Sequence, residues 1–270
     1  MKIRKLLCIV LGVVFLSGMM GSASASQIQE RTLFQSDEIK DQKIIAERMA
    51  NGITDDPSIK VEAHISGDII TDESGKQYKV VVKDVKCTSQ KLKEVLIGGK
   101  RQQDFVANSM TELVIVPLEY GNDIPAYDAD GSMVGAGTLN QTTYYSYETG
   151  IYNDDIPDGT VYKFTRTYSK LTQADGSFYL DSLILKLHGA GSYSSNKTGP
   201  FYITAGKTDL RSFDNPISGS TYTLFADDTD YWWWIKSGCA VGAHLKAESW
   251  GTITRAGNTW EFYTLVQRTS

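Results

Sequence analysis

From Ile59 onward the sequence consists of short runs of β-branched and aromatic residues, separated by Gly, Asp, Asn and Pro. In the last run, Trp260, Phe262, Thr264 and Val266 alternate with more polar neighbours. Successive side chains of a strand point to opposite faces, so a period of two predicts strands that bury one face. We expect the face with Trp260 and Val266 to lie in the core.

Eight such runs in the second half are separated by turn residues, which is typical of a sandwich or barrel. The sequence therefore predicts a mostly all-β fold, an antiparallel β-sandwich or partly open barrel with one short N-terminal helix. Lys60–Ile70 and Gln77–Val85 are predicted to form a hairpin, and Glu112–Glu119 a further strand. The eight predicted strands are Thr142–Glu148, Val161–Leu171, Phe178–His188, Phe201–Ala205, Thr221–Ala226, Tyr231–Lys236, His244–Thr254 and Thr259–Arg268.

The predicted helix covers Ser36–Asn51, with Ser36 as its N-cap and Asn51-Gly52 as its end. A stretch rich in Gly, Asp and Ala follows the first β runs and marks a boundary. We expect a secretory signal peptide (1–25), an N-terminal helical arm (26–58), a small β subdomain (59–120), a loop or seam (121–140) and a β-sandwich-like domain (141–270).

The N-terminus predicts export of a bacterial type. Lys2, Arg4 and Lys5 precede an apolar stretch of fifteen residues, and Ala23-Ser24-Ala25 forms a small-residue cleavage site. The stretch is shorter than the roughly 20 residues of a spanning helix, and no second one approaches that length. We expect a secreted, extracellular protein cleaved near Ala25.

The net charge of the chain argues against one class of partner, nucleic acid. Loss of the three basic residues of the signal peptide lowers the formal net charge from −5 to −8, and the remainder has no block of Lys or Arg. Nucleic-acid binding requires a basic surface, so nucleic acid is not an expected partner.

Two cysteines, Cys87 and Cys239, lie beyond the predicted cleavage site. In an oxidising compartment they can pair, and the disulfide would close a loop of about 150 residues, worth on the order of 5 kcal/mol in the chain-entropy model. The alternatives are two separate buried thiols, or Cys239 as a nucleophile with His244 as its base.

The run Tyr231-Trp232-Trp233-Trp234 is the most unusual segment. In a strand, Trp232 and Trp234 point away from the face of Tyr231 and Trp233, so either both faces are covered or a large ring is exposed. An exposed ring can stack on a sugar, and we take Tyr231–Trp234 as candidate ligand-binding residues. Tyr144, Tyr145 and Tyr147 would extend this surface. The alternative is that the aromatic run fills the core, or that the N-terminal helix covers its outer face.

Metal and cofactor motifs are weak. Asp128–Ser132 opens like a calcium loop, but its Gly falls at the fourth position and no Glu stands at the twelfth, so calcium is a minor alternative to solvated turns. The acidic segments Asn153–Asp155 and Asp227–Asp230 are likewise interpreted as solvated turns. His64, His188 and His244 have no zinc-ligand spacing, and no serine-hydrolase elbow occurs. We predict no metal and no cofactor.

These observations favour a secreted, non-enzymatic binding protein that contacts a glycan, cell-surface or protein partner through the aromatic run. One alternative is a secreted membrane-active toxin, since the strands are rich in Ser, Thr and Tyr. Another is an exported hydrolase whose paired carboxylates come from distant strands and leave no local motif. The catalytic residues of such an enzyme are unknown.

Overall fold

The computed structural model describes residues 30–66, 69–71, 75–118, 137–150, 159–173, 179–194, 202–226, 232–234, 244–255 and 258–269. These ranges contain thirteen strands and one helix, so the predicted mostly all-β class is confirmed. The helix is α2 (Gln42–Ala50). The strands are β1 (Glu30–Gln35), β2 (Lys60–Ser66), β3 (Ile70–Thr71), β4 (Gln77–Ile97), β5 (Lys100–Pro117), β6 (Gly137–Gly150), β7 (Gly159–Gln173), β8 (Tyr179–Ser194), β9 (Tyr202–Asp214), β10 (Thr221–Phe225), β11 (Trp232–Trp234), β12 (His244–Arg255) and β13 (Asn258–Thr269).

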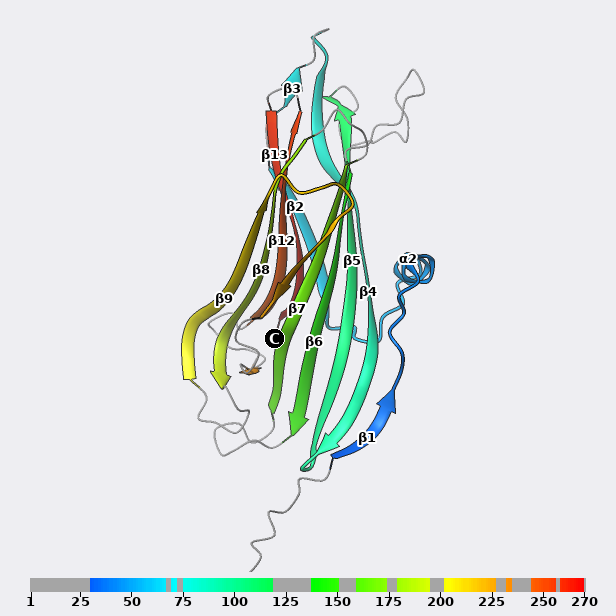
Figure 1. Cartoon of the computed structure of the whole chain (residues 1–270), viewed down its shortest axis with the longest axis vertical. Helices are drawn as coiled ribbons and strands as arrows, with labels where there is room; N and C mark the ends of the chain where they lie inside the picture. Colours follow the sequence, from blue (N-terminus) through cyan, green and yellow to red (C-terminus); the bar gives the residue numbers. More distant parts are fainter. Residues whose placement is uncertain are drawn as a thin grey trace, which may run out of the picture.

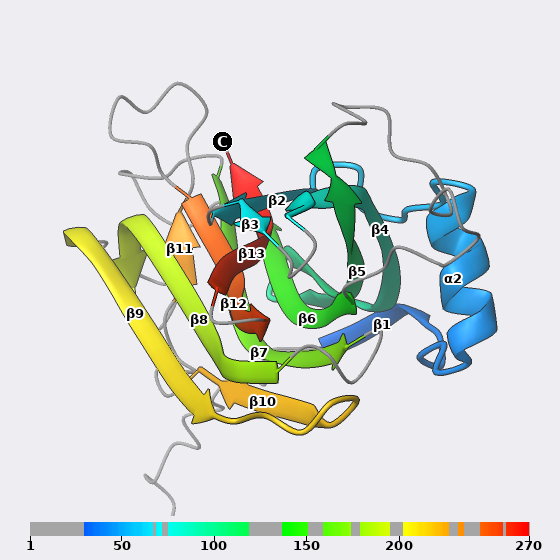
Figure 2. The same cartoon turned by 90° about the horizontal axis from the view of Figure 1, so that it is seen from above.

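Hydrogen bonds connect all the described strands into one antiparallel sheet, in the order β1-β4-β5-β6-β7-β11-β8-β12-β13-β2. β3 pairs with β4, β9 with β8 and β10 with β7. The long strands run along the length of an elongated body (Figure 1). Seen from above, the sheet curls so that β2 and β13 approach β4 and β5, which gives the predicted sandwich-like, partly open barrel (Figure 2).

Hydroxyl groups join the two halves of the curled sheet in its interior. Thr111 of β5 and Thr264 of β13 lie 2.7 Å apart, and Ser169 of β7 and Ser249 of β12 lie 2.5 Å apart. All four residues are buried, although neither pair belongs to neighbouring strands. Because a buried hydroxyl needs a partner, these contacts fix how the two halves lie against each other.

The core lies between the two halves. Trp260, Phe262 and Val266 are at most 1% exposed, which confirms the face predicted for the last strand. They belong to a cluster with Leu183 and Leu185 of β8. Packing apolar faces against each other removes a large apolar area from water, and this burial stabilises the curled form.

The helix starts five residues later than predicted. Its N-cap is Asp41 rather than Ser36, and the Asp41 carboxylate accepts a hydrogen bond from the backbone N–H of Lys43. Ser36 instead donates its backbone N–H to the carbonyl of Leu92 and its hydroxyl to the carbonyl of Lys91. Bonding to β4 therefore ties Ser36 to the sheet, outside the helix.

The predicted hairpin between the first two β runs is correct only next to its turn, where Ile70 pairs with Tyr78 and Thr71 with Gln77. β2 pairs with β13, far away in sequence, while only the two-residue β3 pairs with β4. The sequence between β5 and β6 lies mostly outside the described residues, but the two strands pair over thirteen positions from Arg101↔Thr149 to Leu113↔Gly137. The two β units expected on either side of the seam thus share one sheet.

Gly189 of β8 gives a test of this packing. A Cβ atom there would lie 2.3 Å from the Trp233 ring, so we expect Gly189→Ala to destabilise the protein by about 1–3 kcal/mol, as overpacked cores do. Gly150→Ala is the matched control, because its Cβ meets mainly the flexible side chain of Lys100. Thermal unfolding measures both variants, and equal midpoints would contradict the packing of Trp233 over Gly189.

Candidate functional site

The aromatic run lies on β11, between β7 and β8. Trp233 is 5% exposed and belongs to the core cluster, so its ring is not available to stack on a ligand. Tyr231 and the side chains of Trp232 and Trp234 lie outside the described part of the structure. Their role as a ligand surface stays a prediction.

Inside the sheet, a row of rings leads from β5 to β11. Phe105 stacks on Tyr147 with 5.2 Å between ring centroids, and Tyr147 contacts Tyr162 at 5.8 Å. Tyr162 stands opposite Trp233 in the pairing of β7 with β11. Tyr147 is therefore linked to Trp233 through Tyr162, within the packing of the core.

The predicted disulfide and the acidic turns lie wholly or partly outside the described residues. Cys239 is among these, as are Asp128–Ser132, Asn153–Asp155 and Asp227–Asp230. Cys87 is on β4 with a free thiol in the described structure, and burial, with the nearby charge of Asp56, raises its pKa to about 12. A thiol of this kind stays protonated at neutral pH.

Two of the three histidines come together although their spacing gives no sign of it. His244 Nε2 lies 3.2 Å from His188 Nδ1, across the pairing of β12 with β8. Burial and the neighbouring His244 lower the pKa of His188. Within the described ranges, no group of three or more His, Cys, Asp and Glu residues is arranged to hold a metal ion.

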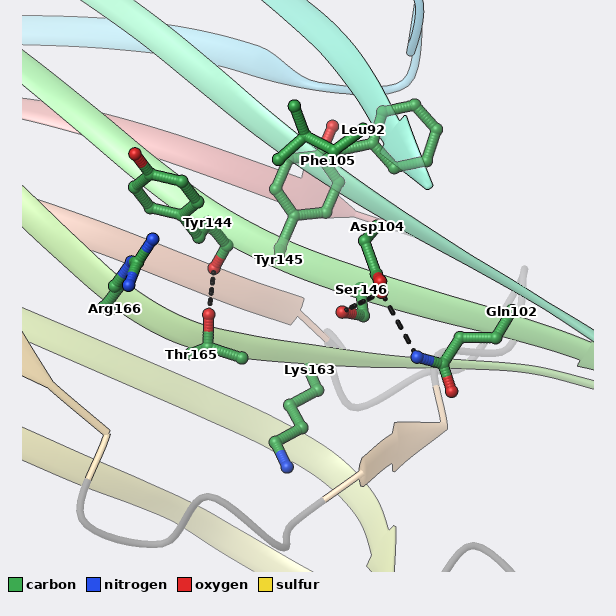
Figure 3. Close-up of a pocket in the computed structure, with 10 residues that line it drawn as sticks. All are labelled: Leu92, Gln102, Asp104, Phe105, Tyr144, Tyr145, Ser146, Lys163, Thr165 and Arg166. Atoms are coloured by element: carbon green, nitrogen blue, oxygen red, sulfur yellow. Dashed lines mark hydrogen bonds between the residues drawn. The ribbon is translucent and has the colours of Figure 1, made fainter. Parts of the chain in front are cut away.

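A groove of about 370 Å³ crosses β4, β5, β6 and β7 (Figure 3). This volume falls within the usual range of small-ligand sites. Ten residues line the groove, and most of them are polar. They are Leu92 of β4; Gln102, Asp104 and Phe105 of β5; Tyr144, Tyr145 and Ser146 of β6; and Lys163, Thr165 and Arg166 of β7.

Two β-bulges shape the groove. The register between β4 and β5 shifts between Lys91 and Lys93, which leaves Leu92 as the extra residue. The register between β6 and β7 shifts beside Tyr144, which leaves Thr165 as the extra residue. Because a bulge re-aims the side chains around it, both extra residues line the groove.

Phe105 and Tyr145 line the groove from β5 and β6, and their rings belong to the core cluster, on the face of the sheet opposite to the side chains of Asp104 and Ser146. Phe105 and Tyr145 are each 2% exposed and stack with 5.4 Å between their centroids. The Tyr145 hydroxyl donates a 2.9 Å hydrogen bond to the buried carboxylate of Asp56. Asp56 also accepts a hydrogen bond from the backbone N–H of Ser58, so the segment after α2 holds the Tyr145 ring in the core.

Asp104 organises the polar side chains on one part of the lining. Its Oδ1 accepts a 2.7 Å hydrogen bond from the hydroxyl of Ser146 and a 3.2 Å bond from the amide of Gln102 (Figure 3). A carboxylate, a hydroxyl and an amide together offer both donors and acceptors. This combination suits a ligand with several hydroxyl groups.

Arg166 and Tyr144 form the other part of the lining. The guanidinium lies 3.9 Å from the centre of the Tyr144 ring, a cation–π contact, and Figure 3 shows the two side by side. The Tyr144 hydroxyl donates a 2.5 Å hydrogen bond to Glu38, which lies in the segment before α2. Burial and this bond raise the pKa of Tyr144, so the hydroxyl stays protonated at neutral pH.

A comparison of the chain with protein-family models, curated proteins and solved structures finds no significant match. In the described part of the chain, no helix has the length and apolar character needed to cross a membrane. The site is therefore interpreted from its own residues.

Cys87 gives a test of side-chain burial on β4. In a Cys8→Ser/Cys239→Ser variant it is the only cysteine, and its pKa of about 12 leaves little thiolate at pH 8. We expect alkylation by iodoacetamide to be roughly a thousandfold slower in the folded protein than in urea, because thiolate falls about tenfold per pKa unit. Similar rates in the two states would show that Cys87 is accessible and ionised.

Proposed function

We propose that the chain is an exported, non-enzymatic binding protein that takes a glycan ligand in the groove across β4–β7. The observation that carries this proposal is the polar lining itself, in which a hydroxyl and an amide are both hydrogen-bonded to one carboxylate. Fixed polar groups bind well because little conformational entropy is lost when the ligand arrives. Export is supported by the signal-like N-terminal sequence.

The groove favours binding over hydrolysis by paired carboxylates. That mechanism needs two carboxyl groups facing each other about 5–9 Å apart. The described lining contains one carboxylate, Asp104, and its Oδ1 already accepts two hydrogen bonds. The same groups are well suited to orient sugar hydroxyls.

Asp104→Ala tests the groove directly. It removes the central acceptor, and we expect affinity for a bound saccharide to fall about tenfold to a hundredfold, the usual effect of losing a charge-assisted hydrogen bond. Saturation-transfer NMR with a panel of neutral and acidic mono- and disaccharides finds the ligand, and calorimetry measures its affinity.

Asp84→Ala is the control, because Asp84 pairs with Lys86 on β4 and does not line the groove. It should leave saccharide affinity unchanged. If no saccharide in the panel binds, or if both variants bind as the parent does, glycan binding in this groove is wrong. Dye release from liposomes would then favour the membrane-active alternative.

The tryptophan run is a second candidate surface for the same kind of ligand, on its sequence pattern. We expect Trp232→Ala to reduce adsorption to insoluble polysaccharide while keeping the melting temperature. Trp233→Ala should instead lower stability by about 3–5 kcal/mol, because a buried ring leaves a cavity. Unchanged adsorption of folded Trp232→Ala would remove this surface from consideration.

A further inference from the structure

We infer that the groove selects acidic saccharides, with Arg166 binding the carboxylate of a uronic-acid-type sugar while the Asp104 side binds its hydroxyls. This inference rests on the glycan-binding function proposed above. It concerns which sugar the groove prefers. Its evidence comes from Arg166 and Tyr144, whereas the proposal of glycan binding rests on Asp104 and its hydrogen-bond partners.

Arg166 has a buried donor with no partner. Its Nε is shielded from solvent and has no hydrogen-bond acceptor among the described residues. None of the ion pairs between described residues includes Arg166. The guanidinium therefore has no anionic partner among these residues, and a ligand carboxylate in the groove can supply one.

The guanidinium is also held in a fixed orientation. It stacks on Tyr144 at 3.9 Å, with the Tyr168 ring 5.5 Å away on the same strand as Arg166. Arg166 directly follows Thr165, the extra residue of the β7 bulge. A planar guanidinium that is already oriented matches a planar carboxylate through two parallel N–H···O bonds, which a lysine does not form.

The second cation of the lining, Lys163, lies at the Asp104 end of the groove, because it stands opposite Ser146 and Ser146 stands opposite Asp104. Lys163 lies on β7 three residues before Arg166, and both line the groove. Asp104 lies on β5, so an acidic sugar can place its carboxylate at β7 and its hydroxyls at β5 and β6. A neutral sugar has no carboxylate for β7 and can bind only the polar groups of β5 and β6.

The overall charge restricts the length of the ligand. The chain carries a formal net charge of −5, which repels a long polyanion before it reaches the groove. A single carboxylate close to Arg166 gains a short-range charge-assisted bond that this long-range repulsion opposes only weakly. We therefore expect uronic acids and their short oligomers to bind, and highly sulfated chains to bind poorly.

The test compares sugars that differ only in the carboxylate. NMR titrations use glucuronate against glucose and galacturonate against galactose, with the parent protein and with Arg166→Gln, Arg166→Lys and Arg211→Gln. Arg211 is the matched control, since its guanidinium also lies over a ring, that of Phe213, but on β9 outside the groove. Thermal unfolding confirms that each variant is folded.

We expect uronates to bind at least about tenfold more tightly than the neutral sugars, as one charge-assisted pair predicts. Arg166→Gln should remove this preference, Arg166→Lys should retain part of it, and Arg211→Gln all of it. Equal binding of uronate and neutral sugar by the parent, or an unchanged preference in folded Arg166→Gln, overturns the carboxylate inference and leaves glycan binding standing. Binding of neither sugar overturns the proposed function itself.

Discussion

A wide sheet with one apolar face has to bury that face against itself when no other layer is large enough to cover it. Here the only described helix, α2, has nine residues and lies outside β4, where it buries Ile45. The sheet therefore curls, and its two halves meet through the Thr111–Thr264 and Ser169–Ser249 contacts. The hydroxyl pairs match only in one register, so they select a particular curled form as well as stabilising it.

The sequence pattern predicted those features of the fold that depend only on neighbouring residues in the chain. Alternation gave all eight strands of the second half and the buried face with Trp260 and Phe262. It did not predict that β2 pairs with β13, because pairing partners depend on the closure of the whole sheet. It also misplaced the start of the helix, since the hydrogen bonds that Ser36 donates to β4 are long-range contacts with no sequence signature.

The groove was beyond sequence reasoning for a related reason. Leu92, Asp104, Tyr144 and Arg166 come from four strands and meet only through the registers of β4 to β7. The bulges at Leu92 and Thr165 break the period of two without any Gly or Pro to mark them. The tryptophan run gave the stronger signal, but the described member, Trp233, fills the core.

The groove is held from both faces of the sheet. On the core face, the Tyr145–Asp56 bond and the stacking of Phe105 on Tyr145 fix the strands that carry it. On the other face, the Arg166 guanidinium stacks on Tyr144, directly after the bulge in β7. Arg166 Nε has no acceptor among the described residues, but the buried Gln141 Oε1, which does not line the groove, has no hydrogen-bond partner among them either. A ligand is therefore inferred from where the guanidinium lies, and not from the cost of one unpaired atom.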